Sequence, residues 1–188
     1  MTSGLPGLIS DIANPFVIFT TLYAATAFSY AGFSGQATLY LGLELAAAGL
    51  VAGYVFRLRR RRRVGDFWIS TRKERLIPAI VLLVSFVGLL AALVFTNAPP
   101  ELFRVTLSMG LAAATVAALT TVWKASAHSA VAGHAAVAGI VLLGGFGLVF
   151  VGLLPLVGWA RIARKAHTPA QVLVGAGVGS LLAGFLLL

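Results

Sequence analysis

Long apolar runs, separated by short polar or basic segments, make up most of this chain. A helix that crosses a bilayer needs about 20 consecutive apolar residues, and runs close to this length recur from residue 16 to the C-terminal residue. The pattern predicts an all-α, polytopic transmembrane helix bundle of six to seven spans. The expected spans are residues 16–32, 37–56, 76–95, 102–122, 126–143, 145–159 and 169–188.

The segment between Ser126 and Trp159 decides the number of spans. Its 34 residues contain no charged group, which is long for one membrane helix and short for two. Gly144-Gly145 offers a break, because glycine weakens a helix. The count is six if this pair does not split the segment and seven if it does.

The basic residues favour seven spans. In that arrangement 13 of the 14 Lys and Arg residues fall on one face, and only Arg104 falls on the other. Lys and Arg in short loops favour the cytoplasm, so we expect the basic face and the N-terminus there. With six spans, Arg161 and its neighbours would move to the far face. The 13 residues are Arg57, Arg59–Arg63, Arg72, Lys73, Arg75, Lys124, Arg161, Arg164 and Lys165.

Composition supports an integral membrane protein with one domain over residues 1–188. The chain is 60% hydrophobic and only 10% charged, whereas soluble domains have about 25% charged residues. In a soluble chain the net charge of +9 would indicate a nucleic-acid ligand; here it indicates topology and anionic lipid headgroups instead. We therefore expect membrane lipids and no nucleic acid as partners. The N-terminal segment has no basic n-region, so no removable signal peptide is expected.

Three polar stretches border predicted helix ends on the basic face: residues 70–78, 123–128 and 160–171. Guanidinium groups bind phosphate oxygens in a bidentate way, and helix N-termini favour anions. Two imidazoles surrounded by cations suit phosphoryl transfer, in which one attacks phosphorus and the other protonates the leaving oxygen. The stretches provide the cations Arg72, Lys73, Arg75, Lys124 and Arg161, the hydroxyl of Ser126, and the imidazoles of His128 and His167.

These stretches resemble the motifs of the type-2 phosphatidic acid phosphatase superfamily, which includes lipid phosphate phosphatases and haloperoxidases. The family motif S-R-x5-H-x3-D corresponds to Ala160-Arg161, then His167, then Gln171. The motif P-S-G-H corresponds to residues 125–128, "ASAH", and K-x6-R-P is matched loosely by "RKERLIP". The chain is more similar still to a bacterial subgroup with the forms "REDRIIP", "K-x-S-x-H" and "AHTPxQ". The resemblance covers roughly residue 66 to the C-terminus and suggests a bacterial inner-membrane protein.

The resemblance implies a role for each motif residue and implies no metal or other cofactor. His167 would be the nucleophile that forms a phosphohistidine, and His128 would protonate the leaving group. The side chains that would hold phosphate oxygens are those of Arg161, Arg75, Arg72, Lys124 and Ser126.

Gln171 departs from the family motif, which has Asp at this position. On a helix His167 and Gln171 are four residues apart and can touch. The Gln carbonyl can fix the tautomer of the imidazole, but it cannot stabilise an imidazolium by charge. Glu74 offers a substitute carboxylate if the first stretch folds over the site, or it pairs with the Arg and Lys beside it.

Other polar or small residues have simpler interpretations. Taken singly, His128 and His167 would be interfacial histidines bonded to backbone groups. His134 lies on a different helix face, and we expect a polar contact between helices. Gly175 and Gly179 form a G-x-x-x-G pattern that indicates helix packing. The basic run 57–63 is expected to end a span and to anchor it among headgroups.

Three functions are consistent with these features. The first is hydrolysis of a lipid-linked phosphate monoester or diphosphate, such as phosphatidate, phosphatidylglycerophosphate or a polyprenyl phosphate. The second is a catalytically impaired relative that acts as an anionic-lipid-binding scaffold or regulator, which Gln171 favours. The third is a small transporter or flippase. Proton and ion pathways usually need a charged residue in mid-span, and we expect none here, which counts against this function. A homo-oligomer is compatible with all three.

The division of basic residues predicts the membrane topology. The N-terminus should be cytoplasmic and the C-terminus external, because seven spans place the termini on opposite sides. A reporter fused after Leu188 that is active only in the cytoplasm should therefore stay inactive. An active cytoplasmic reporter would rule out the seven-span arrangement.

Overall fold

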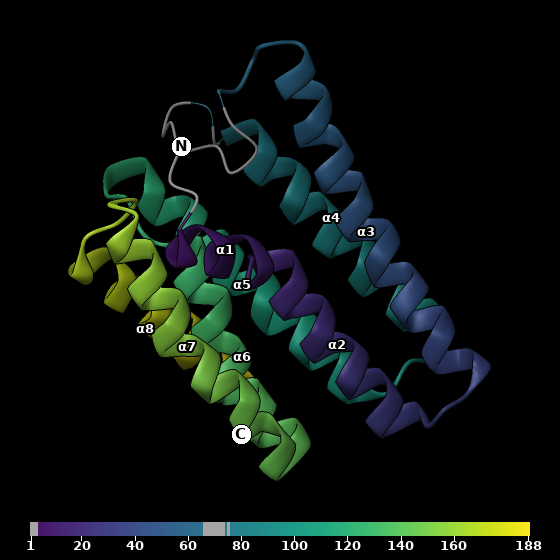
Figure 1. Ribbon diagram of the computed structural model, residues 1–188. Coiled ribbons are helices and arrows are strands. Elements are labelled where there is room, and N and C mark those ends of the chain that lie inside the picture. Colours follow the sequence, from purple (N-terminus) through teal and green to yellow (C-terminus); the bar gives the residue numbers. More distant parts are fainter. Residues whose placement is uncertain (1–3, 66–73, 75) are drawn as a thin grey trace.

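The computed structural model describes residues 4–65, 74 and 76–188, and every long element among them is an α-helix (Figure 1). The predicted all-α bundle is therefore confirmed. The helices are α1 (Leu5–Ile12), α2 (Pro15–Ala31), α3 (Gly35–Arg60), α4 (Leu76–Phe95), α5 (Pro100–Val122), α6 (Ala127–Leu143), α7 (Leu148–Ala163) and α8 (Pro169–Leu187), with a 3₁₀ turn at Gly144–Gly147.

By length and composition, five helical stretches are able to cross a membrane, or six if α1 and α2, bent by 45° at their junction, form one span. One of the five is Ala127–Ala163, but the turn at Gly144–Gly147 folds this stretch back on itself. A Cβ at Gly147 would collide with the backbone of Gly139, whereas eight residues of straight helix would separate them by about 12 Å. The split predicted at Gly144-Gly145 is therefore present, and α2 to α8 run alternately up and down the bundle (Figure 1).

Caps explain where several helices begin and end. The side chains of Asn14 and Ser34 accept hydrogen bonds from the backbone N–H groups of Val17 and Ala37, the third residues of α2 and α3, at 3.0 and 3.2 Å. α3 continues past the predicted end at residue 56 to Arg60, because arginine is a good helix former. It then closes through Arg62, which has a left-handed φ of 54°.

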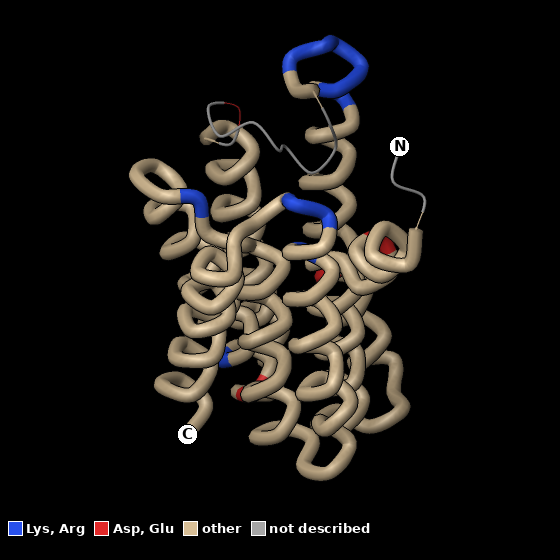
Figure 2. The backbone as a smooth tube through the Cα atoms, turned by 60° about the vertical axis from the view of Figure 1, so that its left-hand side comes forward, with Lys and Arg blue, Asp and Glu red and all other residues tan. Residues whose placement is uncertain are grey.

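The described Lys and Arg residues gather at one end of the bundle, as the sequence predicts. Figure 2 shows the basic segments at the upper end, with the tip of α3 projecting beyond its neighbours. Arg104 is the exception, since it lies in the second turn of α5, next to the opposite end. The predicted positions Arg72, Lys73 and Arg75 lie outside the described residues.

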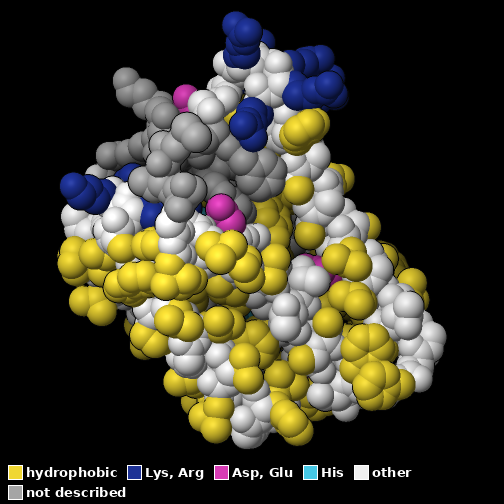
Figure 3. All heavy atoms as spheres, viewed as in Figure 1, with side chains coloured by type: hydrophobic (Ala, Val, Ile, Leu, Met, Phe, Trp, Pro, Cys, Tyr) yellow, Lys and Arg dark blue, Asp and Glu magenta, His cyan; other side chains and the backbone are white. Residues whose placement is uncertain are grey.

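The outer surface of the bundle in Figure 3 is largely apolar below its basic end. Large side chains such as Phe95, Leu181 and Phe185 are more than 70% exposed. Such residues are suited to lipid, in which apolar exposure has no cost. This distribution agrees with an integral membrane protein.

Glycines allow α6 and α8 to approach at backbone distance. A Cβ at Gly175 would collide with the carbonyl oxygen of Ser126, and one at Gly179 with that of Ala130. On α6, a Cβ at Gly133 would collide with the carbonyl oxygen of Ala176 on α8. The predicted role of the G-x-x-x-G pattern in packing is confirmed, and the contact places the N-termini of α6 and α8 beside each other.

His134 makes the predicted polar contact between helices. Its Nε2 lies 2.7 Å from the hydroxyl of Ser108 on α5, and both side chains are fully buried. Ser108 also donates to the carbonyl of Val105 at 3.1 Å, so its oxygen is placed to accept from His134. The pair joins α5 to α6 inside the bundle.

Helix α1 was not predicted from the sequence. It exposes Leu5, Leu8 and Ile12 on one face, packs against α7, and brings Asp11 to 3.7 Å from Arg164. Both charged side chains are partly exposed, so the ion pair adds little stability, about 0–1 kcal/mol. The apolar face is that of an interfacial helix.

Replacement of Gly179 by Ala tests the packing of α6 against α8. The added methyl must push Ala130 away, so we expect a loss of about 1–3 kcal/mol in unfolding free energy. Gly177→Ala is the matched control, because nothing lies within 4 Å of its Cβ position; it should be neutral or stabilising by up to about 1 kcal/mol. Unfolding in mixed micelles measures both. Equal stabilities would contradict the close backbone contact.

Candidate functional site

The turn between α7 and α8 places His167. Lys165 adopts a left-handed φ of 53°, and its N–H donates to Ile162 at 2.8 Å. The N–H groups of Ala166 and His167 donate to the carbonyl of Arg161 at 3.1 and 3.3 Å. This is the hydrogen-bond pattern of a helix closed by a left-handed residue. Arg161 and His167 therefore share one rigid turn.

A capping box starts α8 directly after His167. The hydroxyl of Thr168 accepts from the N–H of Gln171 at 3.3 Å, and Oε1 of Gln171 accepts from the N–H of Thr168 at 3.2 Å. Pro169 follows at the first helical position, where a missing N–H has no cost. The side chain of Gln171 is thus held by the backbone in front of His167.

The capping box fixes the tautomer of His167. Nδ1 of His167 lies 3.2 Å from Oε1 of Gln171. This oxygen already accepts from a backbone N–H, so the group facing Nδ1 is an acceptor and Nδ1 must carry the proton. Nε2 is then the basic, nucleophilic nitrogen of the neutral ring. Gln171 therefore fixes the tautomer of the imidazole, as the sequence suggested, and does so through this hydrogen bond alone.

The start of α6 adjoins the same residue. Ser126 caps α6: its hydroxyl accepts from the N–H and the hydroxyl of Ser129 at 3.3 and 2.9 Å. Its own N–H donates to the backbone carbonyl of Gln171 at 3.2 Å. Gln171 thus contacts His167 through its side chain and Ser126 through its backbone. The second and third predicted stretches meet here.

His128, Arg161 and Lys124 belong to the elements that meet at this junction. His128, in the first turn of α6, and Arg161, in the last turn of α7, are buried, with 6% and 8% exposure. His167 is also 8% exposed, and Lys124 is half-buried in the turn before α6. Two helix N-termini converge on the junction, and their partial positive charges favour an anion.

Ser126 and Glu74 have hydrogen-bond partners that the sequence did not predict, and two predicted arginines lie outside the described residues. Ser126 is fully buried and works as a helix cap, so its hydroxyl is already engaged in α6. Glu74 accepts from the backbone N–H of Gly65 at 3.1 Å, instead of meeting His167. Arg72 and Arg75 are outside the described residues.

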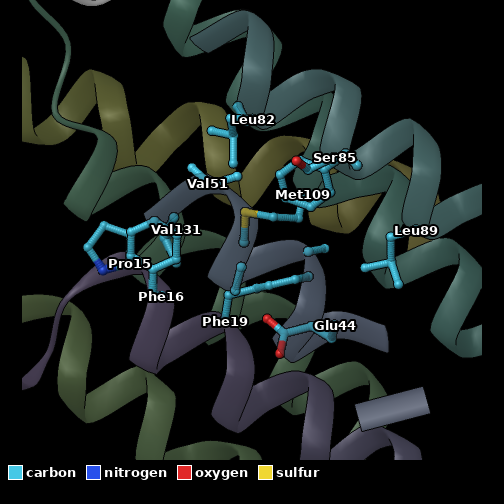
Figure 4. Close-up of a pocket in the computed structure, with 14 residues that line it drawn as sticks. Pro15, Phe16, Phe19, Glu44, Val51, Leu82, Ser85, Leu89, Met109 and Val131 are labelled. Carbon is cyan, nitrogen blue, oxygen red and sulfur yellow. The ribbon is translucent and has the colours of Figure 1, made fainter. Parts of the chain in front are cut away.

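Sequence reasoning missed Glu44, and the expectation of no charged residue in mid-span is wrong. Glu44 lies within the predicted span 37–56, in the apolar run "LGLELAAAGL", and is 3% exposed in α3. An acidic residue inside such a run was the available signal. Glu44 lines an apolar pocket that is separate from the two histidines (Figure 4).

Nitrogen NMR of the histidine rings tests the tautomer. With Gln171 in place, the neutral ring of His167 should carry its proton on Nδ1, an uncommon form that the ¹⁵N shifts distinguish. Gln171→Leu should remove this preference, whereas Gln36→Leu, at an exposed position on α3, should leave it unchanged. A wild-type ring protonated on Nε2 would contradict the assigned hydrogen bond.

Comparisons with known proteins do not identify a family or a function for this site. No family model matches the chain, and no curated protein or solved structure matches it.

Proposed function

We propose that the chain is a membrane lipid phosphatase that hydrolyses a lipid-linked phosphate monoester or diphosphate through a phosphohistidine. The observation that carries the proposal is the junction at Gln171. It holds the His167 ring at 3.2 Å by its side chain and the start of the His128 helix at 3.2 Å by its backbone. Motif stretches more than 30 residues apart in the sequence are thereby adjacent in space.

The proposed reaction has two steps. Nε2 of His167 attacks phosphorus, the bond to the lipid oxygen breaks, and His128 gives that oxygen a proton. Water then attacks the phosphohistidine, with His128 as the base, to release inorganic phosphate and restore His167. Arg161, on the same turn as His167, is proposed to hold phosphate oxygens together with Lys124 and the two helix N-termini.

Gln171 limits the rate in this scheme. Attack by Nε2 leaves positive charge on the ring, and an amide oxygen offsets that charge less than a carboxylate does. In serine proteases, replacement of the orienting Asp by Asn lowers kcat by about 10⁴, through the wrong tautomer. Here the tautomer is correct, so the expected deficit is smaller.

The substrate class follows from the surroundings. The junction lies at the basic end of a bundle whose outer surface is apolar, so a phosphate group attached to a lipid tail would reach it from the membrane. The proposed location is the cytoplasmic face of a bacterial inner membrane, since the basic residues lie at this end.

Substitution of each histidine tests the enzyme hypothesis. His167→Ala should reduce phosphate release from lipid phosphates to background, and His128→Ala should slow it by about 10²–10⁴-fold. His134→Gln is the matched control, because among the described residues His134 bonds to Ser108 on α5 and takes no part in the proposed reaction. A wild-type rate that survives His167→Ala would contradict the proposed nucleophile.

Gln171→Asp tests the role of the amide. A carboxylate at this position should raise the rate, since it keeps the hydrogen bond to Nδ1 and adds a negative charge beside the ring. The melting temperature of the variant must be measured alongside, because Asp is one methylene shorter and weakens the capping box. A well-folded variant with a lower rate would show that the amide has a role of its own.

The alternative function is a scaffold or regulator that binds anionic lipid without turnover. The amide of Gln171, at a position where the resembled motif has a carboxylate, favours this alternative. In that case none of the histidine variants changes a background rate, yet Arg161→Ala still weakens binding to vesicles that contain anionic lipid.

A further inference from the structure

Glu44 occupies a position where burial of a carboxyl group costs free energy. It lies nine residues into α3, about 14 Å along the helix from the end opposite the basic tip. The hydrocarbon core of a bilayer is about 30 Å thick, so Glu44 is near its midplane. Ionisable groups at this depth are costly and are a default indication of function.

The hydrogen bonding of the carboxyl group is incomplete. Oε1 accepts from the hydroxyl of Thr20 on α2 at 2.8 Å. Oε2 is buried and has no hydrogen-bond partner among the described residues. The hydroxyl of Tyr23, fully buried and close enough to interact electrostatically with Glu44, likewise has none. Buried polar atoms without partners are rare in folded proteins and point to a missing ligand or water.

Glu44 lines an apolar pocket of about 110 Å³ between α2, α3, α4, α5 and α6, which we term the Glu44 pocket. Figure 4 shows the carboxylate beside Phe19, with residues of α4 and α5 across from it. Apart from Glu44 and Ser85, its lining is entirely apolar and aromatic. In Figure 3 an acidic group is visible in the hollow between α2 and α3. The walls include Phe16, Phe19, Val51, Leu82, Phe86 and Met109.

We propose that the Glu44 pocket is an intramembrane binding site for a lipophilic amine, whose ammonium group pairs with Glu44 and whose hydrocarbon part fills the apolar walls. An ammonium group supplies both the compensating charge and the N–H donors that a buried carboxylate needs. The enclosed volume suits a short alkyl segment, because an apolar cavity of about 150 Å³ holds one benzene. Longer chains would extend from the hollow into the lipid.

An amine fits better than the other membrane-soluble classes. A hydrocarbon tail would cover the walls but leave Oε2 without a donor. A long-chain alcohol would donate one hydrogen bond but bring no charge, and the attraction between opposite charges is strongest where the dielectric constant is low. A second acid would bring no positive charge to compensate Glu44. The site is separate from the histidine junction and does not depend on the proposed phosphatase activity.

Binding of n-pentylamine and n-pentanol to the full chain in zwitterionic nanodiscs tests the proposal. The two probes match in length and differ in the charged group. Pentylamine should bind the wild-type protein about tenfold tighter than pentanol, and Glu44→Gln should remove this preference. Glu101→Gln, at the start of α5, is the control for loss of an acidic group and should keep it.

Two further results decide the proposal even if Glu44→Gln does not fold. Ala48→Phe, which places a ring in the Glu44 pocket, should weaken pentylamine binding by at least about tenfold. In the wild-type protein alone, equal affinities for pentylamine and pentanol would overturn the proposal and indicate a water-filled or purely apolar site. Preserved amine preference in a folded Glu44→Gln variant would overturn it as well.

Discussion

The backbone contact between α6 and α8 is the interaction on which the rest of the structure depends. In a bilayer no hydrophobic force pulls helices together, so close packing and hydrogen bonds must do so. Gly133, Gly175 and Gly179 remove the side chains that would keep the two helices apart. The contact continues to the basic end, where the N–H of Ser126 reaches the carbonyl of Gln171. The same packing that stabilises the bundle therefore sets the distance between the two motif stretches.

Local backbone chemistry then determines the orientation of the His167 ring. The left-handed residue at the end of α7 ties His167 to Arg161, and the capping box of α8 ties it to Gln171. Neither device requires a charged partner. Gln171 orients the ring by a hydrogen bond without adding a negative charge, which is compatible with either the proposed slow enzyme or a binding protein.

Much of the fold could be predicted because membrane helices leave a strong signal in hydropathy. The apolar runs gave the spans to within a few residues for most helices, and the split at Gly144-Gly145 followed from length and glycine. The end of α3 was misplaced because arginines continue a helix as readily as they stop a membrane span. The segment at α1 was missed because eight residues carry too little periodicity.

The candidate site could be predicted only in part. The four-residue spacing predicted the contact between His167 and Gln171, although His167 precedes α8 and the contact is made through the capping box. The use of Ser126 as a cap depends on where α6 begins, which hydropathy does not locate to one residue. The pocket at Glu44 is formed by residues from five helices far apart in the sequence, so no local pattern reveals its walls.

Trapping of the covalent intermediate tests the central claim most directly. Acid-free quenching of the protein during turnover of a ³²P-labelled lipid phosphate, followed by peptide mapping, locates any phosphoryl group. The account predicts an acid-labile, base-stable label on His167 that accumulates in His128→Ala, because that variant lacks the base for the second step. A label on His128 or on a Ser, or phosphate release with no label on any residue while His167→Ala remains active, would contradict it.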